Sequence, residues 1–115
     1  MQRFFCILAV TLCPAMGMAQ SHCKGQTQID ANFCAKEKWE IADKELNRIW
    51  KQVKPRADAR GTGKALLDKQ RAWLKKRDAT CEPERNSDGS AAAMFYWDCM
   101  ERLTLQRNQE LRAYR

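Results

Sequence analysis

The sequence is short of the residues from which enzymes build reactive centres. Its 115 residues include one histidine, His22, in a segment near the start of the mature chain that we predict to be mobile. A nucleophile activated by histidine, of the Ser-His or Cys-His kind, therefore has little to build on. No glycine-rich loop of the kind that cradles phosphates is present either. These absences disfavour an enzyme, and we expect no catalytic residues.

Long apolar runs are also scarce. The main one, residues 4–13, follows a cation and is about half as long as the roughly 20 residues of a membrane-spanning helix. Because a G-M-A cleavage pattern follows it, residues 1–19 are predicted to be a signal peptide. Residues 20–115 are then one exported domain, periplasmic or secreted, without a transmembrane segment. Neither Cys13 nor Cys23 has a lipobox-like context of small residues, so we expect no lipid anchor.

No two cysteines are separated by two residues, the spacing most typical of zinc sites. Removal of the first 19 residues leaves four cysteines, Cys23, Cys34, Cys81 and Cys99. An even number behind an export signal predicts two disulfides, with no metal and no other cofactor. By count alone, three pairings of the four cysteines are available.

The positions of the cysteines favour the pairs Cys23–Cys34 and Cys81–Cys99. On one straight helix, Cys23 and Cys34 would lie about 16 Å apart, beyond the roughly 7 Å limit between bridged Cα atoms. We therefore expect Cys23 to precede the first helix and fold back onto it. The second pair would close the loop between the second and third helices.

No segment alternates in the manner of a strand, and helix signals dominate from Thr27 onward. Thr27, followed by Asp30 three residues later, is typical of a helix start. Apolar residues recur every three or four positions in three segments, which predicts an all-α, antiparallel three-helix bundle. The expected helices cover residues 27–54 (ended by Pro55), 64–80, and 91 onward, joined by a breaker-rich segment, 55–63, and a polar loop, 82–90.

The segment QRAWLKKRDATC, residues 70–81, places polar side chains on the apolar stripe of the second helix. Burying an unpaired guanidinium is costly, so an arginine on this stripe needs a partner. The first helix offers an aspartate and an asparagine one turn apart. We predict a structural polar cluster that fixes which helix faces meet, in preference to a catalytic site. Its members are Asp43, Asn47, Gln70 and Arg77, with Arg107 of the third helix as a further candidate.

Positive charge is concentrated between residues 44 and 77, where twelve Lys and Arg stand against three Asp and Glu. Lys44, Arg48 and Lys51 are expected on one exposed face of the first helix. Two interpretations stay open: a solvated face of a basic protein, or a docking surface for an anionic partner. Export argues against nucleic acid as that partner, and the four tryptophans fall on or beside core stripes, which favours packing over base stacking.

The order of the motifs resembles that of a known family. A Cys-x10-Cys pair is followed by ADKELN (42–47), QRAWLKKRDATC (70–81), DGS (88–90), Cys99 and LTLQRNQEL (103–111). This pattern is similar to the LprI-type small secreted proteins, named for a lysozyme inhibitor, over nearly all of the mature chain. The resemblance implies an all-helical, disulfide-linked exported domain whose matching positions belong to the scaffold. The founding inhibitor is a lipoprotein, whereas this chain has no lipobox.

Two hypotheses for function follow. The first is a non-catalytic binding protein that occludes the carboxylate-lined cleft of a partner protein such as a lysozyme. Its candidate contacts are Arg85 in the loop 82–90 and the stripe Lys44, Arg48 and Lys51. Many lysozymes are themselves cationic, so two positive proteins would lose electrostatic steering. The alternative is an envelope-associated adaptor or immunity-type protein that binds another effector or anionic envelope polymers through its basic face.

Overall fold

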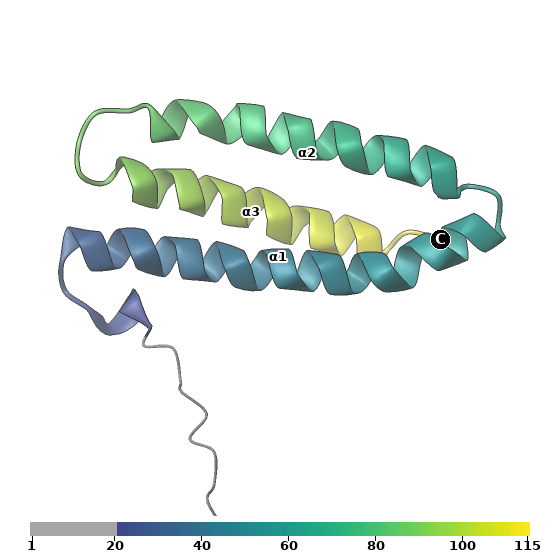
Figure 1. The fold of residues 1–115 in the computed structure, drawn as a ribbon, viewed down its shortest axis with the longest axis horizontal. Coiled ribbons are helices and arrows are strands. Elements are labelled where there is room, and N and C mark those ends of the chain that lie inside the picture. Colours follow the sequence, from purple (N-terminus) through teal and green to yellow (C-terminus); the bar gives the residue numbers. More distant parts are fainter. Residues whose placement is uncertain (1–20) are drawn as a thin grey trace, which may run out of the picture.

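The computed structural model describes residues 21–115, which form a three-helix bundle (Figure 1). A short 3-10 helix, η1 (His22–Lys24), precedes α1 (Gln28–Ala59), α2 (Gly63–Arg85) and α3 (Ala92–Arg112). These residues contain no strand, and successive helices run in opposite directions, which confirms the predicted all-α bundle. The predicted signal peptide, residues 1–19, lies outside the described residues. Within residues 21–115, no helix has the length and apolar character needed to cross a bilayer.

Helix α3 lies between α1 and α2, and its contact with α1 is the most extensive in the bundle (Figure 1). The buried apolar side chains form two clusters along the bundle axis. The larger cluster lies toward the α1–α2 connection and contains Leu46, Ile49, Val53, Ala57, Leu66 and Leu111. The smaller lies toward the α2–α3 connection and contains Cys81, Tyr96 and Met100. Each of the four tryptophans packs against one of these clusters, as expected for core residues.

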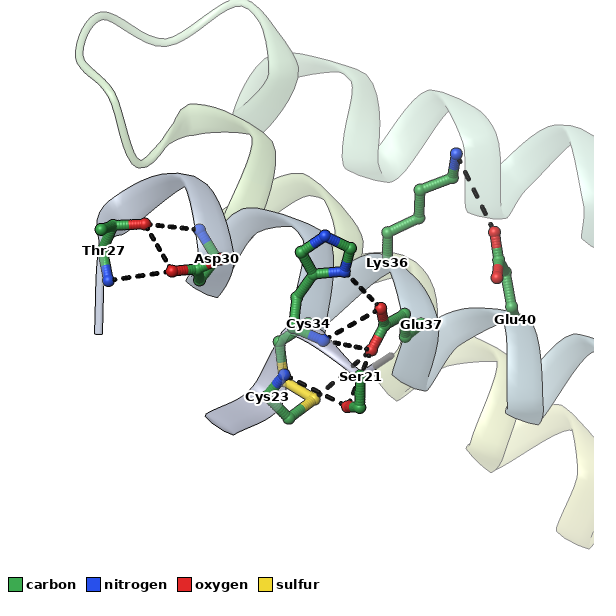
Figure 2. A network of polar contacts seen from close by, with 9 residues as sticks. Ser21, Cys23, Thr27, Asp30, Cys34, Lys36, Glu37 and Glu40 are labelled. Carbon is green, nitrogen blue, oxygen red and sulfur yellow. Dashed lines mark hydrogen bonds and ion pairs between the residues drawn. A yellow bond between two sulfur atoms is a disulfide. The ribbon is translucent and has the colours of Figure 1, made fainter. Parts of the chain in front are cut away.

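The start of α1 is fixed by a reciprocal capping box, as predicted (Figure 2). The backbone N–H of Asp30 donates to Thr27 Oγ1 at 3.1 Å, and the backbone N–H of Thr27 donates to Asp30 Oδ2 at 3.3 Å. These two bonds satisfy donors that a helix start otherwise leaves without partners.

The end of α1 differs from the prediction, because the helix does not stop at Pro55 but continues to Ala59. Proline lacks the N–H that an interior position would donate, which costs one helical hydrogen bond. The buried stripe, however, continues through Ala57, which is 1% exposed and packs in the larger cluster. The helix is terminated just after its C-cap residue Arg60 by Gly61, whose φ of 79° is left-handed. There the N–H of Thr62 donates to the Ala57 carbonyl at 2.9 Å, as in a Schellman motif.

Helix α2 is also longer than predicted, because it passes through Pro83 and ends at Arg85. The predicted loop 82–90 is therefore shorter, and its first four residues are helical. The buried Cys81 holds this last part of α2 on α3, and the N–H of Asn86 still donates to the Glu82 carbonyl at 3.3 Å. Tertiary anchoring thus outweighs the one hydrogen bond that Pro83 cannot make.

Both predicted disulfides are present. Cys23 and Cys34, with Cα atoms 4.6 Å apart, tie η1 to α1. Cys81 and Cys99, with Cα atoms 5.7 Å apart, join the end of α2 to α3. The two bridges brace the same end of the bundle, where the chain passes from α2 to α3.

Candidate functional site

The predicted polar cluster is built around Trp73, which two guanidinium groups approach. The Arg77 guanidinium carbon lies 5.1 Å from the Trp73 ring centroid, and that of Arg107 lies 5.8 Å from it. Arg77 is 7% exposed, and its Nη1 donates to Thr104 Oγ1 at 3.3 Å while its Nε donates to Asp78 Oδ1 at 3.1 Å. The predicted buried arginine is therefore paired, as the cost of burying a charge requires.

Arg107 is a full member of the cluster. Its Nε donates to Gln70 Oε1 at 2.8 Å, and its Nη1 donates to Glu110 Oε2 at 2.9 Å. Gln70 and Arg107 thus join α2 to α3 across the same Trp73 ring that Arg77 flanks. These contacts hold helices together and leave little of either guanidinium free for chemistry.

The structure corrects the part of this cluster that was assigned to the first helix. The hydrogen bonds of Arg77 go to Thr104 and Asp78, not to Asp43 or Asn47. The reason is that α2 packs more extensively on α3 than on α1, and the face of α2 that carries Arg77 meets α3. Asp43 and Asn47 instead line a surface depression between α1 and α2, together with Gln70.

Two buried polar residues of α3, Thr104 and Asn108, were missing from the sequence prediction. Thr104 is fully buried, and its hydroxyl donates to the Met100 carbonyl at 2.7 Å while accepting from Arg77. Asn108 is 1% exposed, and its Nδ2 donates to the Ala42 carbonyl of α1 at 3.1 Å. Their four-residue spacing from Tyr96 and Met100 is the sequence signal that could have found them.

The basic stripe on α1 is exposed, as expected. Lys44, Arg48 and Lys51 all face solvent, but Arg48 donates from Nε to Glu45 Oε2 at 2.8 Å. Glu45 also accepts from Arg112 of α3 at 2.8 Å. Hydrogen bonds from Arg48 first and Arg112 second lower the pKa of the Glu45 carboxyl to about 2, and the same pair raises the pKa of Arg48. Within residues 21–115, Lys44 and Lys51 form no ion pair.

Arg85 is the last residue of α2, at the base of the loop rather than within it. Its guanidinium carbon lies 4.0 Å from the Tyr96 ring centroid, a cation–π distance. The connecting segment, residues 86–91, turns at Gly89, whose φ is 104°. Asn32 of α1 anchors this segment by donating from Nδ2 to the Ser90 carbonyl at 2.9 Å.

His22 does not lie in a mobile segment, contrary to the sequence prediction. Its Nδ1 is 2.6 Å from Glu37 Oε1, and its ring stacks on Phe33 with centroids 4.8 Å apart. Glu37 also contacts Ser21, in the network shown in Figure 2. Hydrogen bonds from His22, before any other cause, lower the pKa of the Glu37 carboxyl. The Cys23–Cys34 bridge explains the order, since it fixes the neighbouring backbone on α1.

Charge is divided between the two halves of the bundle. The basic half, residues 44–77 and 107–115, carries fifteen Lys and Arg against four Asp and Glu. The acidic half, residues 21–43 and 78–106, carries five Lys and Arg against ten Asp and Glu. The fold brings each set together, because the α1–α2 connection and the end of α3 lie at one end and the α2–α3 connection at the other (Figure 1). Among the described residues, no three His, Cys, Asp or Glu side chains gather in a manner suited to a metal ion.

Comparison with known proteins gives one family and one relative. The family model described as Lysozyme inhibitor LprI matches residues 19–111. A protein of Rhizobium meliloti (strain 1021), described as uncharacterized, is 32% identical over 103 residues, which cover 77% of this chain and 74% of the relative. No solved structure matches the chain.

Proposed function

Because the chain belongs to the LprI family, we propose that it is an exported, non-catalytic protein that binds a lysozyme-type muramidase and occludes its cleft. The observation that carries this proposal is the family match over residues 19–111, since that family is described by lysozyme inhibition. Two disulfides support export to the periplasm or beyond, because such bonds persist in oxidising compartments. Arg77 and Arg107 are occupied in holding helices together, so we assign binding to the exposed surface of the bundle.

The occluding element that we propose is the loop end, residues 82–91, which comprises the last turn of α2 and the segment that joins it to α3 at one extremity of the bundle (Figure 1). A narrow projection fits a cleft better than the side of a helix does. The Cys81–Cys99 bridge and the bond from Asn32 to Ser90 hold the loop end in place before binding. Such preorganisation reduces the entropy lost when a loop is ordered in a complex.

The charges of the loop end suit a cationic muramidase. Glu82, Glu84 and Asp88 are exposed there and would face a positive enzyme surface. Arg85, held on the Tyr96 ring, is the one cation of the loop end and would pair with a catalytic carboxylate of the cleft. The acidic half thus removes the electrostatic objection that arises when the protein is treated as uniformly basic.

Lys44, Arg48 and Lys51 form a second candidate surface, for an acidic effector or an anionic envelope polymer. The observation that favours it is the excess of cations in the basic half. Lys44 and Lys51 would contribute most of the attraction, because Arg48 already bonds Glu45. We assign the muramidase to the loop end because this basic surface would repel a cationic enzyme.

Charge reversal at exposed positions tests the assignment. Glu84→Lys with Asp88→Lys is expected to slow association with a cationic muramidase about tenfold at low salt, because steering acts mainly on the association rate. The matched control, Glu40→Lys with Asp68→Lys, raises the net charge equally at exposed sites outside the loop end and should slow association less than about threefold.

The measurement is surface-based binding kinetics with turbidity assays of muramidase inhibition, using the mature protein. An equal effect of both double variants would show that net charge, not the loop end, controls binding. Loss of inhibition only in Lys44→Glu with Lys51→Glu would move the interface to the basic stripe. Absence of binding and inhibition across a muramidase panel would overturn the function itself.

A further inference from the structure

We propose that the basic half holds a separate binding site for a phosphate group, in a depression between the end of α1 and the segment after α3. The depression measures about 280 Å³. It is lined by Val53, Arg56, Arg60, Arg112, Tyr114 and Arg115. It lies far along the bundle from the loop end, so it does not depend on muramidase binding.

The walls of this depression come from two segments that the fold joins. Arg56 lies in the last turn of α1 and Arg60 is the C-cap residue one turn later, and both are exposed. The segment after α3 is held across from them by Tyr114, whose hydroxyl donates to Thr62 Oγ1 at 3.1 Å in the α1–α2 connection. The buried Val53 forms part of the lining. The guanidinium groups are therefore presented around a concave surface rather than scattered over a convex one.

The four guanidinium groups are poorly neutralised by the protein itself. Arg112 bonds Glu45, whereas Arg56 donates from Nε to the Gln52 carbonyl, an uncharged acceptor. Within residues 21–115, Arg56, Arg60 and Arg115 have no ion pair with an acidic side chain. Like charges that line one depression repel one another, and an anion bound between them would relieve this repulsion.

The chemistry of the lining selects the ligand class. Guanidinium forks match the oxygens of phosphate in paired hydrogen bonds, which a lysine ammonium does not do. Three guanidinium groups without acidic partners suit a group carrying two or more negative charges better than a single carboxylate. A phosphomonoester or a diphosphate meets this requirement, whether free in solution or carried on a lipid headgroup.

The test uses the mature protein without muramidase, so its result is independent of the inhibitor hypothesis. Pyrophosphate is titrated at 0.15 M NaCl and followed by calorimetry and by the arginine Nε–H signals in NMR spectra, with acetate as the singly charged comparison. Pelleting with phosphatidic acid vesicles against phosphatidylcholine vesicles forms the second arm. The arginine double variant, Arg56→Gln and Arg60→Gln, is compared with a lysine double variant, Lys69→Gln and Lys75→Gln. The lysine variant removes the same charge from exposed sites of α2.

We expect saturable pyrophosphate binding that weakens at least tenfold in the arginine variant and less than twofold in the lysine variant. Acetate should not saturate. Pyrophosphate binding alone would identify a free phosphate ligand, and stronger arginine-dependent capture by phosphatidic acid vesicles would identify a lipid headgroup. Equal weakening in both variants, equal binding of acetate, or no binding in either arm would overturn the proposal.

Discussion

At the scale of single residues, the partly buried Trp73 is the side chain that two arginines approach from different helices. Arg77 and Arg107 approach the same indole ring, and each also bonds a polar side chain of a different helix. A guanidinium held at a cation–π distance from an indole keeps its N–H donors free for hydrogen bonds to other side chains. The cluster thus joins α2 to α3 through two hydrogen bonds, one donated from each helix to the other.

Removal of Arg77 is therefore expected to destabilise the fold. Arg77→Ala should lower the free energy of unfolding by about 2–4 kcal/mol, because it removes a buried side chain, its cation–π contact with Trp73 and its hydrogen bond to Thr104. Arg77→Met keeps the apolar stem and should lose less. Urea denaturation measures both, with the exposed Arg71→Ala as a control expected within about 0.5 kcal/mol of wild type. A similar loss in the control would refute the role of Arg77.

Part of this cluster was accessible from the sequence, and part was not. Gln70 and Arg77 stand out because they interrupt an apolar stripe, and a buried charge must have a partner. The identity of the partner depends on which helix lies opposite, and helical periodicity does not contain that information. On α3, the neighbouring line through Leu103 and Arg107 appeared more apolar than the line through Thr104 and Asn108, although the latter is the buried one.

At the scale of elements, the end of α1 shows how tertiary burial overrides a local breaker. Pro55 predicts the end of the helix, yet burial continues to Ala57 one half-turn later. The positions of all three helices followed from periodicity, because each has a sustained buried stripe. Their ends did not, because the cost of an interior proline is smaller than the apolar burial and the disulfide that extend α1 and α2 beyond it.

Two substitutions at the end of α1 distinguish these roles. Pro55→Ala should raise the free energy of unfolding by about 1–2 kcal/mol, because alanine restores the missing N–H within a continuous helix. Gly61→Ala should lower it by about 1 kcal/mol, because φ at this position is 79° although a Cβ meets no atom within 4 Å. Urea denaturation with constant m-values checks both. A loss of stability in Pro55→Ala would mean that the restriction Pro55 places on the unfolded chain outweighs its missing hydrogen bond.

At the scale of the whole molecule, the two halves of the bundle differ in charge and in covalent bracing. Both disulfides lie in the acidic half, whereas the basic half is held by the larger apolar cluster. The division separates the two proposed activities: a rigid acidic loop end for a cationic protein, and an arginine-lined depression for a phosphate group. Neither proposed activity is evident from the net positive charge of the whole chain, because that value sums the acidic and the basic half.

The two bridges are expected to contribute differently, and their removal tests this division. Loss of Cys81–Cys99 in the double alanine variant should lower the free energy of unfolding by about 3 kcal/mol from loop closure, and further because Cys81 is fully buried beside Tyr96 and Met100. Loss of Cys23–Cys34 should cost less than this total, because Cys23 is exposed and the bridge ties down only η1.

Circular dichroism during urea denaturation measures the stability of both double variants. If the loop end occludes a muramidase, the variant without Cys81–Cys99 should no longer inhibit the muramidase in the absence of urea, even though its helices remain folded there. The variant without Cys23–Cys34 should retain inhibition there. Pyrophosphate binding in the basic half should persist in both variants, because neither bridge contacts that depression. Full inhibition without Cys81–Cys99 would mean that a fixed loop end is not what blocks the partner.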